Sequence, residues 1–519
     1  MIAVAIIALY LLGLGTASLW EIDEAIYAEI AREMTLRHDY IAPFYNYAPR
    51  FDKPPLIYWI TAGAYRIFGV SELAVRVQST LFGLLTIALV WWLGRRMFPD
   101  REAGRYAAVV LATSLGWFVI SRMGITDAGL TFGLSLALAA LWVGWQDAQR
   151  AWYLLSGLGL GLAILAKGPV ALVLFGGVLV FTLGTRLFQL LREGWAWLGF
   201  LLALLIPLPW HLIMNARYGS GFWSSYFGYH MFTRFTTGIE QHGFPWWYYL
   251  PVLLVTFLPW SLIIPAALRP EAHREREWAA YRLLVSWAGV VLVFFSVAKT
   301  KLPGYILPAF PPLSLLVGWY SAERKLRQRS ERSRAPYFFG AGLFVVAALG
   351  IAFWYVSWPK VPREYAEAYR WLAFFPIAYG LAGMVLLAFF ETGRRSPDLI
   401  FWVLAATVAL TLAGAALIVI PALEVNKPVK PLATLARSAP RGTIVASALG
   451  DAGAPFYARR RVEYASGDRL RALLHGTRPS WVMAYPRDLA AAGFERARAA
   501  GRARVIARAG GAWLVAYTP

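Results

Sequence analysis

The chain opens with an apolar run, residues 2–19 (IAVAIIALYLLGLGTASL), that passes directly into Trp20-Glu21-Ile22-Asp23-Glu24. A run of this length is close to what a helix needs to span the hydrocarbon core. Three carboxylates at the mouth of such a helix are costly to place beside lipid, which makes them candidates for function. We expect an uncleaved first span, because no basic residues precede the run as they would in a signal peptide.

The composition extends this reading to the whole chain. Of 519 residues, 59% are hydrophobic and 15% are charged, and the apolar residues come in long runs typical of a polytopic helical membrane protein. The 24 Trp and 26 Tyr suit aromatic belts at the two membrane surfaces. The absence of cysteine excludes disulfides and thiolate chemistry.

The net charge of +21 does not indicate nucleic-acid binding. Much of it lies in short loops between apolar runs, where Lys and Arg set topology and meet anionic membrane lipids. No basic stretch outside these loops alternates with stacking aromatics, as a nucleic-acid surface would. The net positive charge therefore indicates contact with membrane lipids and not with nucleic acid.

The apolar runs predict about thirteen transmembrane helices. With the N-terminus inside, arginines concentrate in the predicted cytoplasmic loops, as the positive-inside rule requires, and the C-terminus lies outside. The predicted spans are 2–19, 75–94, 104–121, 127–146, 152–166, 168–185, 196–214, 247–268, 279–298, 303–320, 336–357, 371–390 and 398–421.

Two domains follow from this topology. Residues 1–425 form an all-α membrane domain with outer-face loops 20–74 and 215–246. Residues 426–519 have the composition of a small soluble module, with strands expected at 443–449, 481–485, 505–508 and 512–517 and a helix at 468–475. We expect this α/β module on the outer face, as a lid or docking domain without catalytic residues of its own.

Several charged residues fall on that same outer face. Asp23 stands where a helix N-cap would, before an apolar spacing that predicts an interfacial amphipathic helix. Capping explains one acid, but not Glu21, Asp23 and Glu24 together. Asp127 begins a predicted span, where the helix dipole favours an acid. Lys167 interrupts a long apolar run and needs an anion nearby.

Other motifs have both structural and functional explanations. Asp52-Lys53-Pro54-Pro55 is either a turn with a snorkelling lysine or a stiff loop that holds the lysine against a phosphate. Lys301 and Tyr305 add donors at a helix start. His230 or His242 with an acid could hold a divalent metal, although no known metal-ligand spacing is present. His230 and Arg234 share one helical face.

Acids and lysines on one face suit transfer of a sugar from a lipid phosphate. The leaving phosphate gains charge, which preorganised Lys or Arg donors stabilise. The acceptor needs a carboxylate base if it is a hydroxyl, and only positioning if it is a phosphate.

At these motifs the chain resembles the GT-C type membrane glycosyltransferases. The closest resemblance is to the 4-amino-4-deoxy-L-arabinose lipid A transferases, with the protein O-mannosyltransferases as relatives. The similarity rests on Asp23-Glu24, the following residues 27–34 (YAEIAREM), residues 51–59 (FDKPPLIYW), Ala166-Lys167-Gly168-Pro169 and residues 301–308 (KLPGYILP). One departure is Ile26, where those transferases usually carry arginine; another is Asp52, where glutamate is common.

The resemblance implies a GT-C fold with about thirteen spans and an undecaprenyl-phosphate-linked sugar donor. The departures at Ile26 and Asp52 leave the identity of the sugar and the acceptor open. Aminoarabinose is the candidate sugar and lipid A the leading acceptor, in lipid A modification and polymyxin resistance. Another envelope glycan or a protein is the alternative acceptor. The site would face the periplasm, on the outer side of a bacterial inner membrane.

The resemblance also assigns the site residues. The predicted catalytic residues are Asp23, Asp127 and Glu24, and the predicted groups for substrate and lipid phosphate are Lys53, Lys167, Arg234, Tyr305, Tyr27 and Lys301. A divalent metal ion is the one candidate cofactor, with Asp52 and His230 as its ligands by likeness to metal-binding relatives. The rival readings are a polyprenyl-lipid transporter, disfavoured because no internal repeat is visible, and a non-catalytic lipid-binding protein.

Overall fold

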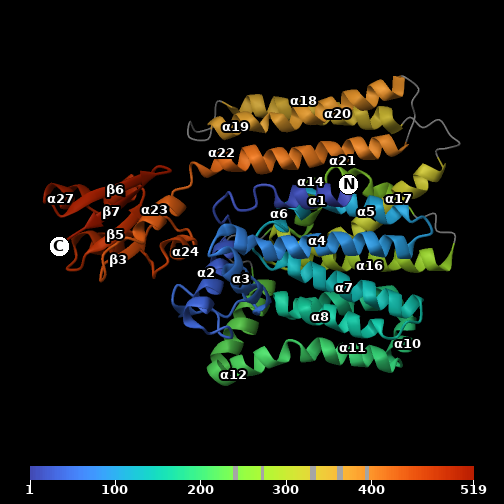
Figure 1. Cartoon of the computed structure of the whole chain (residues 1–519), viewed down its shortest axis with the longest axis horizontal. Coiled ribbons are helices and arrows are strands. Elements are labelled where there is room, and N and C mark those ends of the chain that lie inside the picture. The colour runs from blue at the N-terminus through green and yellow to red at the C-terminus, as the bar shows by residue number, and fades with distance from the viewer. Residues whose placement is uncertain (21, 238–243, 270–273, 328–334, 359–365, 392–396) are drawn as a thin grey trace.

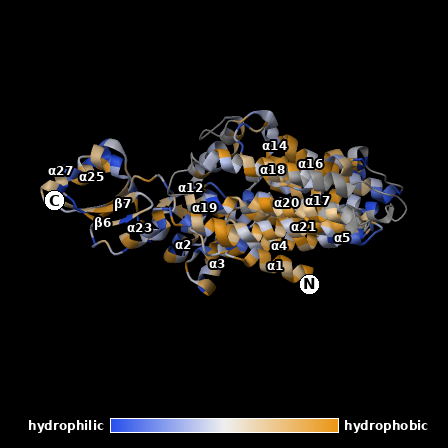
Figure 2. Ribbon diagram, turned by 90° about the horizontal axis from the view of Figure 1, so that it is seen from above, coloured by the Kyte–Doolittle hydropathy of each residue, from blue (hydrophilic) through white to orange (hydrophobic). Residues whose placement is uncertain are grey.

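A computed structural model of the chain describes residues 1–20, 22–237, 244–269, 274–327, 335–358, 366–391 and 397–519. Helices form an elongated bundle, and a small sheet with its own helices extends from one end (Figure 1). Apolar residues dominate the bundle, whereas hydrophilic residues gather at its far end near α5 and in the C-terminal part (Figure 2). The chain is an integral membrane protein.

Five helical segments among the described residues are long and apolar enough to cross a membrane. They are 72–97, 127–146, 194–233, 275–297 and 399–424. The first half of the bundle contains α1 (Ile2–Leu11), α2 (Ile22–Arg37), α3 (Leu56–Phe68), α4 (Glu72–Met97), α5 (Glu102–Ala112), α6 (Leu115–Ile120), α7 (Asp127–Gln146), α8 (Trp152–Lys167), α9 (Val170–Leu183), α10 (Leu187–Leu191), α11 (Gly194–Leu205) and α12 (Leu208–Trp223). The short strands β1 (Phe44–Tyr45) and β2 (Ala48–Pro49) form a hairpin between α2 and α3.

The second half continues with a π-helical segment, η2 (Ser224–Thr233), and shorter pieces before the bundle closes. These elements are α13 (Arg234–Thr236), η3 (Trp246–Tyr248), α14 (Tyr249–Thr256), η4 (Trp260–Leu262), α15 (Ile264–Ala267), α16 (Glu275–Val297), η5 (Pro303–Ala309), α17 (Phe310–Arg327), α18 (Ala335–Ser357), α19 (Ala366–Leu372), α20 (Phe374–Glu391), α21 (Pro397–Gly414), η8 (Ala415–Val419) and α22 (Ile420–Glu424).

Each predicted span has helical structure, but several are not single helices. The span expected at 104–121 is divided into α5 and α6, and the one at 247–268 is a series of short helical turns. Pro251, Pro259 and Pro265 lie within the latter, and a proline removes a backbone donor and clashes with the preceding turn. The coarse architecture is confirmed, and the count of thirteen spans stays a prediction.

Ion pairs define the arginine-rich end of the bundle. Asp147, which follows α7, binds Arg96 at 2.9 Å and Arg276 at 2.8 Å, so the end of α7, the end of α4 and the start of α16 meet there. Because α7 and α8 run antiparallel, the start of α7 and the end of α8 lie together at the opposite end. That opposite end carries most of the predicted site residues.

The helix predicted to lie in the membrane interface is buried instead. In α2 every side chain from Glu24 to Met34 is buried. The prediction of an interfacial helix was wrong because α3, the start of α4 and the C-terminal part all pack against α2, and one apolar cluster joins them.

The C-terminal part is a five-stranded mixed sheet with the order β4-β3-β5-β7-β6. Strands β4, β3 and β5 are parallel, and β7 joins β5 and β6 in antiparallel pairs. The four expected strands and the expected helix are present, whereas the two-residue strand β4 and four of the helices were not predicted. The elements are α23 (Val429–Ala436), β3 (Ile444–Ser447), α24 (Ala454–Ala458), β4 (Glu463–Tyr464), α25 (Gly467–His475), β5 (Ser480–Ala484), α26 (Pro486–Ala491), α27 (Phe494–Ala499), β6 (Ala503–Ala509) and β7 (Ala512–Tyr517).

Hydrogen bonds fix this sheet unit to residues 19–72 of the bundle, here called the outer layer. The Asn46 side-chain amide donates to the Val462 carbonyl at 2.7 Å and accepts the Val462 amide at 2.9 Å. The Tyr457 hydroxyl accepts the Leu19 amide at 2.7 Å and donates to Glu72 at 3.2 Å. The C-terminal part therefore holds the segment that leads into α2.

Candidate active site

Lys167 and Asp127 meet because each stands at the end of a helix. Asp127 is the first residue of α7 and Lys167 the last of α8, positions at which the helix dipoles favour an acid and a base. Lys167 Nζ lies 2.7 Å from Asp127 Oδ1, with about 10% of each side chain exposed. The ammonium also lies 4.5 Å from the centre of the Tyr305 ring, within reach of a cation–π interaction.

Gly168 makes this arrangement possible. Its φ of +87° ends α8 in a conformation that only glycine adopts easily, and Pro169 then starts the next helix. A Cβ at this position would lie 2.7 Å from the Tyr226 hydroxyl oxygen. The motif Lys167-Gly168-Pro169 thus turns the chain sharply and leaves the lysine at the turn.

A second cluster surrounds Asp52. Arg50 Nε lies 3.0 Å from Asp52 Oδ2, and the Tyr58 hydroxyl donates to Oδ1 at 3.3 Å. Burial alone would raise the pKa of Asp52, but the positive charges of Arg50, Lys53 and His230 outweigh it and hold the pKa below its usual value. Asp52 is therefore an ionised carboxylate among cations.

One cavity of about 480 Å³ joins the two clusters. Its polar lining comes from both parts of the predicted site, and phenylalanines make up half of the other lining residues. The polar residues are Asp52, Lys53, Lys167, His230, Thr300 and Tyr305, and the aromatic ones are Phe227, Phe232, Phe235, Phe294 and Phe295. Cations at one wall and an apolar remainder suit a ligand with a phosphate head and a hydrocarbon tail.

Asp23 and Tyr27 lie in the first turns of α2 and are not among the residues that line this cavity. The Tyr27 and Tyr58 ring centres are 5.6 Å apart. Burial, and then the charges of Asp23 and Asp52, raise the pKa of Tyr27 well above its usual value, so the phenol keeps its proton. Asp23 itself is half-buried, in contrast to the buried Glu24 that follows it.

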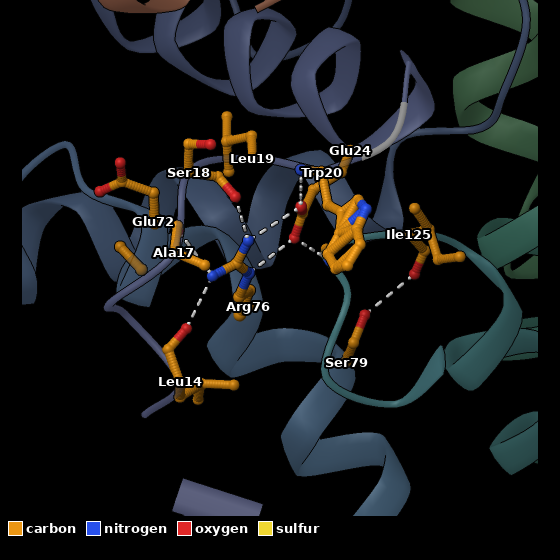
Figure 3. Close-up of polar contacts among 12 residues, drawn as sticks. Leu14, Ala17, Ser18, Leu19, Trp20, Glu24, Glu72, Arg76, Ser79 and Ile125 are labelled. Carbon is orange, nitrogen blue, oxygen red and sulfur yellow. Dashed lines mark hydrogen bonds and ion pairs between the residues drawn. The ribbon is translucent and has the colours of Figure 1, made fainter. Parts of the chain in front are cut away.

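Glu24 is engaged entirely by the protein (Figure 3). Oε1 accepts from Arg76 Nε at 2.8 Å and from the Gly124 amide at 2.9 Å, and Oε2 accepts from the Trp20 amide at 2.7 Å and Arg76 Nη2 at 3.1 Å. With the side chain fully buried, no carboxylate oxygen remains for a substrate. This position does not support the predicted catalytic role and favours a positioning role.

Arg76 completes the same network. Its guanidinium also donates to the carbonyls of Leu14, Ala17 and Ser18 at 2.8 to 2.9 Å (Figure 3). Gly124 lies three residues before Asp127. The Glu24–Arg76 pair thus joins the end of the first apolar run and the start of α2 to the loop that carries the second acid.

The Lys301 ammonium is buried and donates to the Ala298 carbonyl, so it does not line the cavity. Arg234 begins α13 beside the cavity, but its side chain lies outside the described part of the structure, as do Glu21 and His242.

The residues present do not make a complete metal site. Asp52 and His230 line one cavity, but no group of three or more histidine or acidic side chains that could hold a metal occurs in the described ranges. Asp52 already pairs with Arg50. A metal requirement therefore stays a prediction.

Sequence reasoning missed Arg50, Tyr58 and Arg76. Arg76 had a detectable signal, since it is a charge inside the apolar segment that became α4, the criterion that selected Lys167. Arg50 and Tyr58 flank the recognised motif at Asp52-Lys53. The phenylalanines of the cavity carried no signal, because isolated Phe residues are common throughout such a chain.

Comparison with known proteins matches the chain to enzymes that transfer sugars from lipid phosphates. Residues 52–213 match the family model of dolichyl-phosphate-mannose-protein mannosyltransferases. An undecaprenyl phosphate-alpha-4-amino-4-deoxy-L-arabinose arabinosyl transferase from Pseudomonas aeruginosa (strain UCBPP-PA14) is 34% identical over 406 residues, covering 76% of this chain and 72% of that protein. One from Sodalis glossinidius is 35% identical over 361 residues, covering 67% and 64%.

A solved structure resembles the whole chain. The crystal structure of ArnT from Cupriavidus metallidurans bound to undecaprenyl phosphate has a TM-score of 0.82 and 25% sequence identity, and the match covers 99% of this chain and 97% of that one. The apo structure of the same protein has a TM-score of 0.80. The predicted resemblance is confirmed: the chain is a membrane glycosyltransferase and belongs to the undecaprenyl phosphate-alpha-4-amino-4-deoxy-L-arabinose arabinosyl transferase family.

Proposed function

We propose that this enzyme transfers 4-amino-4-deoxy-L-arabinose from undecaprenyl phosphate to lipid A at the periplasmic face of a bacterial inner membrane. The observation that carries the proposal is the cavity with Lys53 and Lys167 at its polar wall and phenylalanines elsewhere. The relatives named for this transfer support the choice of sugar and donor.

The two lysines would bind the donor phosphate. When the bond between the sugar anomeric carbon and the phosphate oxygen breaks, undecaprenyl phosphate leaves with an additional negative charge. Lys53 and Lys167, fixed before the reaction, stabilise that charge in a site that excludes much of the solvent. The phenylalanine wall receives the first isoprene units, which have no polar atoms to satisfy.

Asp127 acts through Lys167. At 2.7 Å its carboxylate holds the ammonium in one position and offsets its charge while no phosphate is bound. Asp23 is a second acid of α2, outside the Glu24 network and near Tyr27 and Tyr58. We assign it to the acceptor, as a base for a hydroxyl or as an orienting group for a phosphate.

The orientation follows from charge. The end of the bundle at which Arg96, Asp147 and Arg276 meet would face the cytoplasm, and the end with the cavity would face the periplasm. Residues 426–519 would then form a periplasmic domain attached to the outer layer, and residues 1–425 the transferase domain.

Mass spectrometry of lipid A tests the proposal. Cells that lack the gene, complemented with the natural chain, should carry aminoarabinose on lipid A and resist polymyxin. Cells with Asp23→Asn or Lys167→Met should carry none, although the protein is inserted in equal amount. Asp468→Asn is the matched control, because this acid in the C-terminal part is 97% exposed at its side chain. The natural amount of aminoarabinose on lipid A in cells with Asp23→Asn would refute the role assigned to Asp23.

The similarity of residues 52–213 to protein mannosyltransferases supplies the second candidate, a protein acceptor. Under that alternative, lipid A would be unchanged in the deletion and a protein-linked sugar would be lost. The transporter alternative is set aside, because the family to which the chain belongs consists of transferases.

A further inference from the structure

A second cavity lies near the arginine-rich end of the bundle, away from the site at Lys167. It has a volume of about 400 Å³ and is enclosed by α7, α8, α9, α10 and α11. Its wall is apolar, with Tyr153, Phe175, Leu190 and Trp197 among the lining residues. Tyr153 is in the first turn of α8, whereas Lys167 is the last residue of that helix. The two cavities therefore belong to different depths of the bundle.

A smaller hollow continues this cavity toward the charged end. Leu141, Leu179 and Leu190 line both spaces. The smaller one is also lined by Arg186 and Arg282, which project from the helix ends around it. Arg282 is exposed and forms no ion pair with any described residue, and Arg186 makes only an exposed contact with Glu275 at 3.3 Å.

Two buried polar atoms in the smaller hollow have no hydrogen-bond partner among the described residues. They are Thr182 Oγ1 and Trp142 Nε1. A buried donor without a partner costs free energy, so such atoms need a bound group to satisfy them. Along the chain, Thr182 lies between Leu179, which lines both spaces, and Arg186, and Trp142 follows the shared Leu141.

We propose that the two spaces together bind one anionic glycerophospholipid from the leaflet at the arginine-rich end. An acyl chain fills the apolar cavity, the phosphate lies by Arg282 and Arg186, and the Thr182 hydroxyl and Trp142 indole donate to glycerol or ester oxygens. Charge complementarity favours this occupant over the neutral tail of the donor, which would gain nothing from two arginines. The inference is independent of the transfer reaction.

Gly176 provides a direct test. It lines the cavity on α9, and a Cβ there would meet no atom within 4 Å. Gly176→Phe should therefore fill the cavity without disturbing the helices around it. Gly176→Ala is the matched control, because it makes the same backbone change and leaves most of the space open.

The full chain is delipidated in detergent and titrated with dioleoyl-phosphatidylglycerol or dioleoyl-phosphatidylethanolamine, and bound lipid is counted by native mass spectrometry. The natural chain and Gly176→Ala should retain one phosphatidylglycerol, and Gly176→Phe should bind it at least about ten-fold more weakly. Arg282→Ala should reduce the preference for phosphatidylglycerol about five-fold, the effect of one arginine near an anionic headgroup.

Three results would overturn the proposal. One is equal phosphatidylglycerol binding by Gly176→Phe and the natural chain, and another is equal binding of both lipids by the natural chain. The third is displacement of the bound lipid by undecaprenyl phosphate, which would assign the cavity to the donor tail. If Gly176→Phe elutes as an aggregate, Arg282→Ala decides alone, because its side chain is exposed.

Discussion

Removal of the Glu24 charge should destabilise the protein strongly. Arg76 Nε lies 2.8 Å from Glu24 Oε1, and the side chains of Glu24 and Arg76 are 0% and 7% exposed. Glu24→Gln leaves the guanidinium buried without its counter-ion, and breaking a buried pair in this way costs about 3–5 kcal/mol. Three backbone carbonyls still solvate Arg76, so we expect a loss near the lower limit, about 3 kcal/mol.

A double-mutant cycle measures the coupling. Arg76→Met alone should also destabilise, because Glu24 is then buried as an unpaired anion. The double variant Glu24→Gln/Arg76→Met should lose less than the sum of the single variants, with a coupling energy of about 2 kcal/mol or more. The free energy of unfolding is followed by titration with sodium dodecyl sulfate in mixed micelles, with tryptophan fluorescence as the signal.

Glu102→Gln is the control for loss of an acid. Glu102 lies 2.9 Å from Arg105, nearly the distance in the buried pair, but both side chains are about 40% exposed. This variant should cost less than about 1 kcal/mol. A similarly small cost for Glu24→Gln, or strict additivity in the double variant, would refute the positioning role of the Glu24–Arg76 pair.

Three further predictions concern the turn, the C-terminal part and pH. Gly168→Ala should destabilise by about 1–3 kcal/mol, because its φ is +87° and its Cβ would meet the Tyr226 hydroxyl oxygen at 2.7 Å; thermal unfolding in detergent checks this. Tyr457→Phe should cost about 1–3 kcal/mol and speed proteolytic release of the C-terminal part, because its hydroxyl links two segments of the outer layer. Because the pKa of Asp52 is lowered in the folded protein, its carboxylate contributes its full stabilisation above about pH 4. That contribution is lost as the pH falls through the lowered pKa. Asp52→Asn should remove this acid dependence from the midpoint of thermal unfolding.

The sequence predicted the residues whose signal is local. Lys167 was recognised as a lone charge in an apolar run, and Asp127 as an acid at a helix start. The antiparallel packing of their helices brings them to 2.7 Å. Lys53 and Tyr305 were recognised from motifs and line the same cavity.

Residues whose role depends on distant partners were not predictable in this way. Glu24 and Asp23 look alike in sequence, but only Glu24 faces Arg76, 52 positions away. The helix α2 has the spacing of an interfacial helix, and it is buried because the C-terminal part, over 400 residues later, packs on it. The breaks within the span predicted at 247–268 coincide with prolines, whose effect on helix geometry depends on neighbouring helices. The break between α5 and α6 contains no proline and had no such signal.

Transfer by the purified enzyme tests the central claim most directly. The protein in detergent is incubated with undecaprenyl-phosphate-linked 4-amino-4-deoxy-L-arabinose and lipid A, and the products are analysed by mass spectrometry. We predict lipid A that is heavier by one aminoarabinose residue and an equal amount of free undecaprenyl phosphate, both absent with Asp23→Asn or Lys167→Met. Unmodified lipid A and intact donor, with a folded enzyme, would contradict the account.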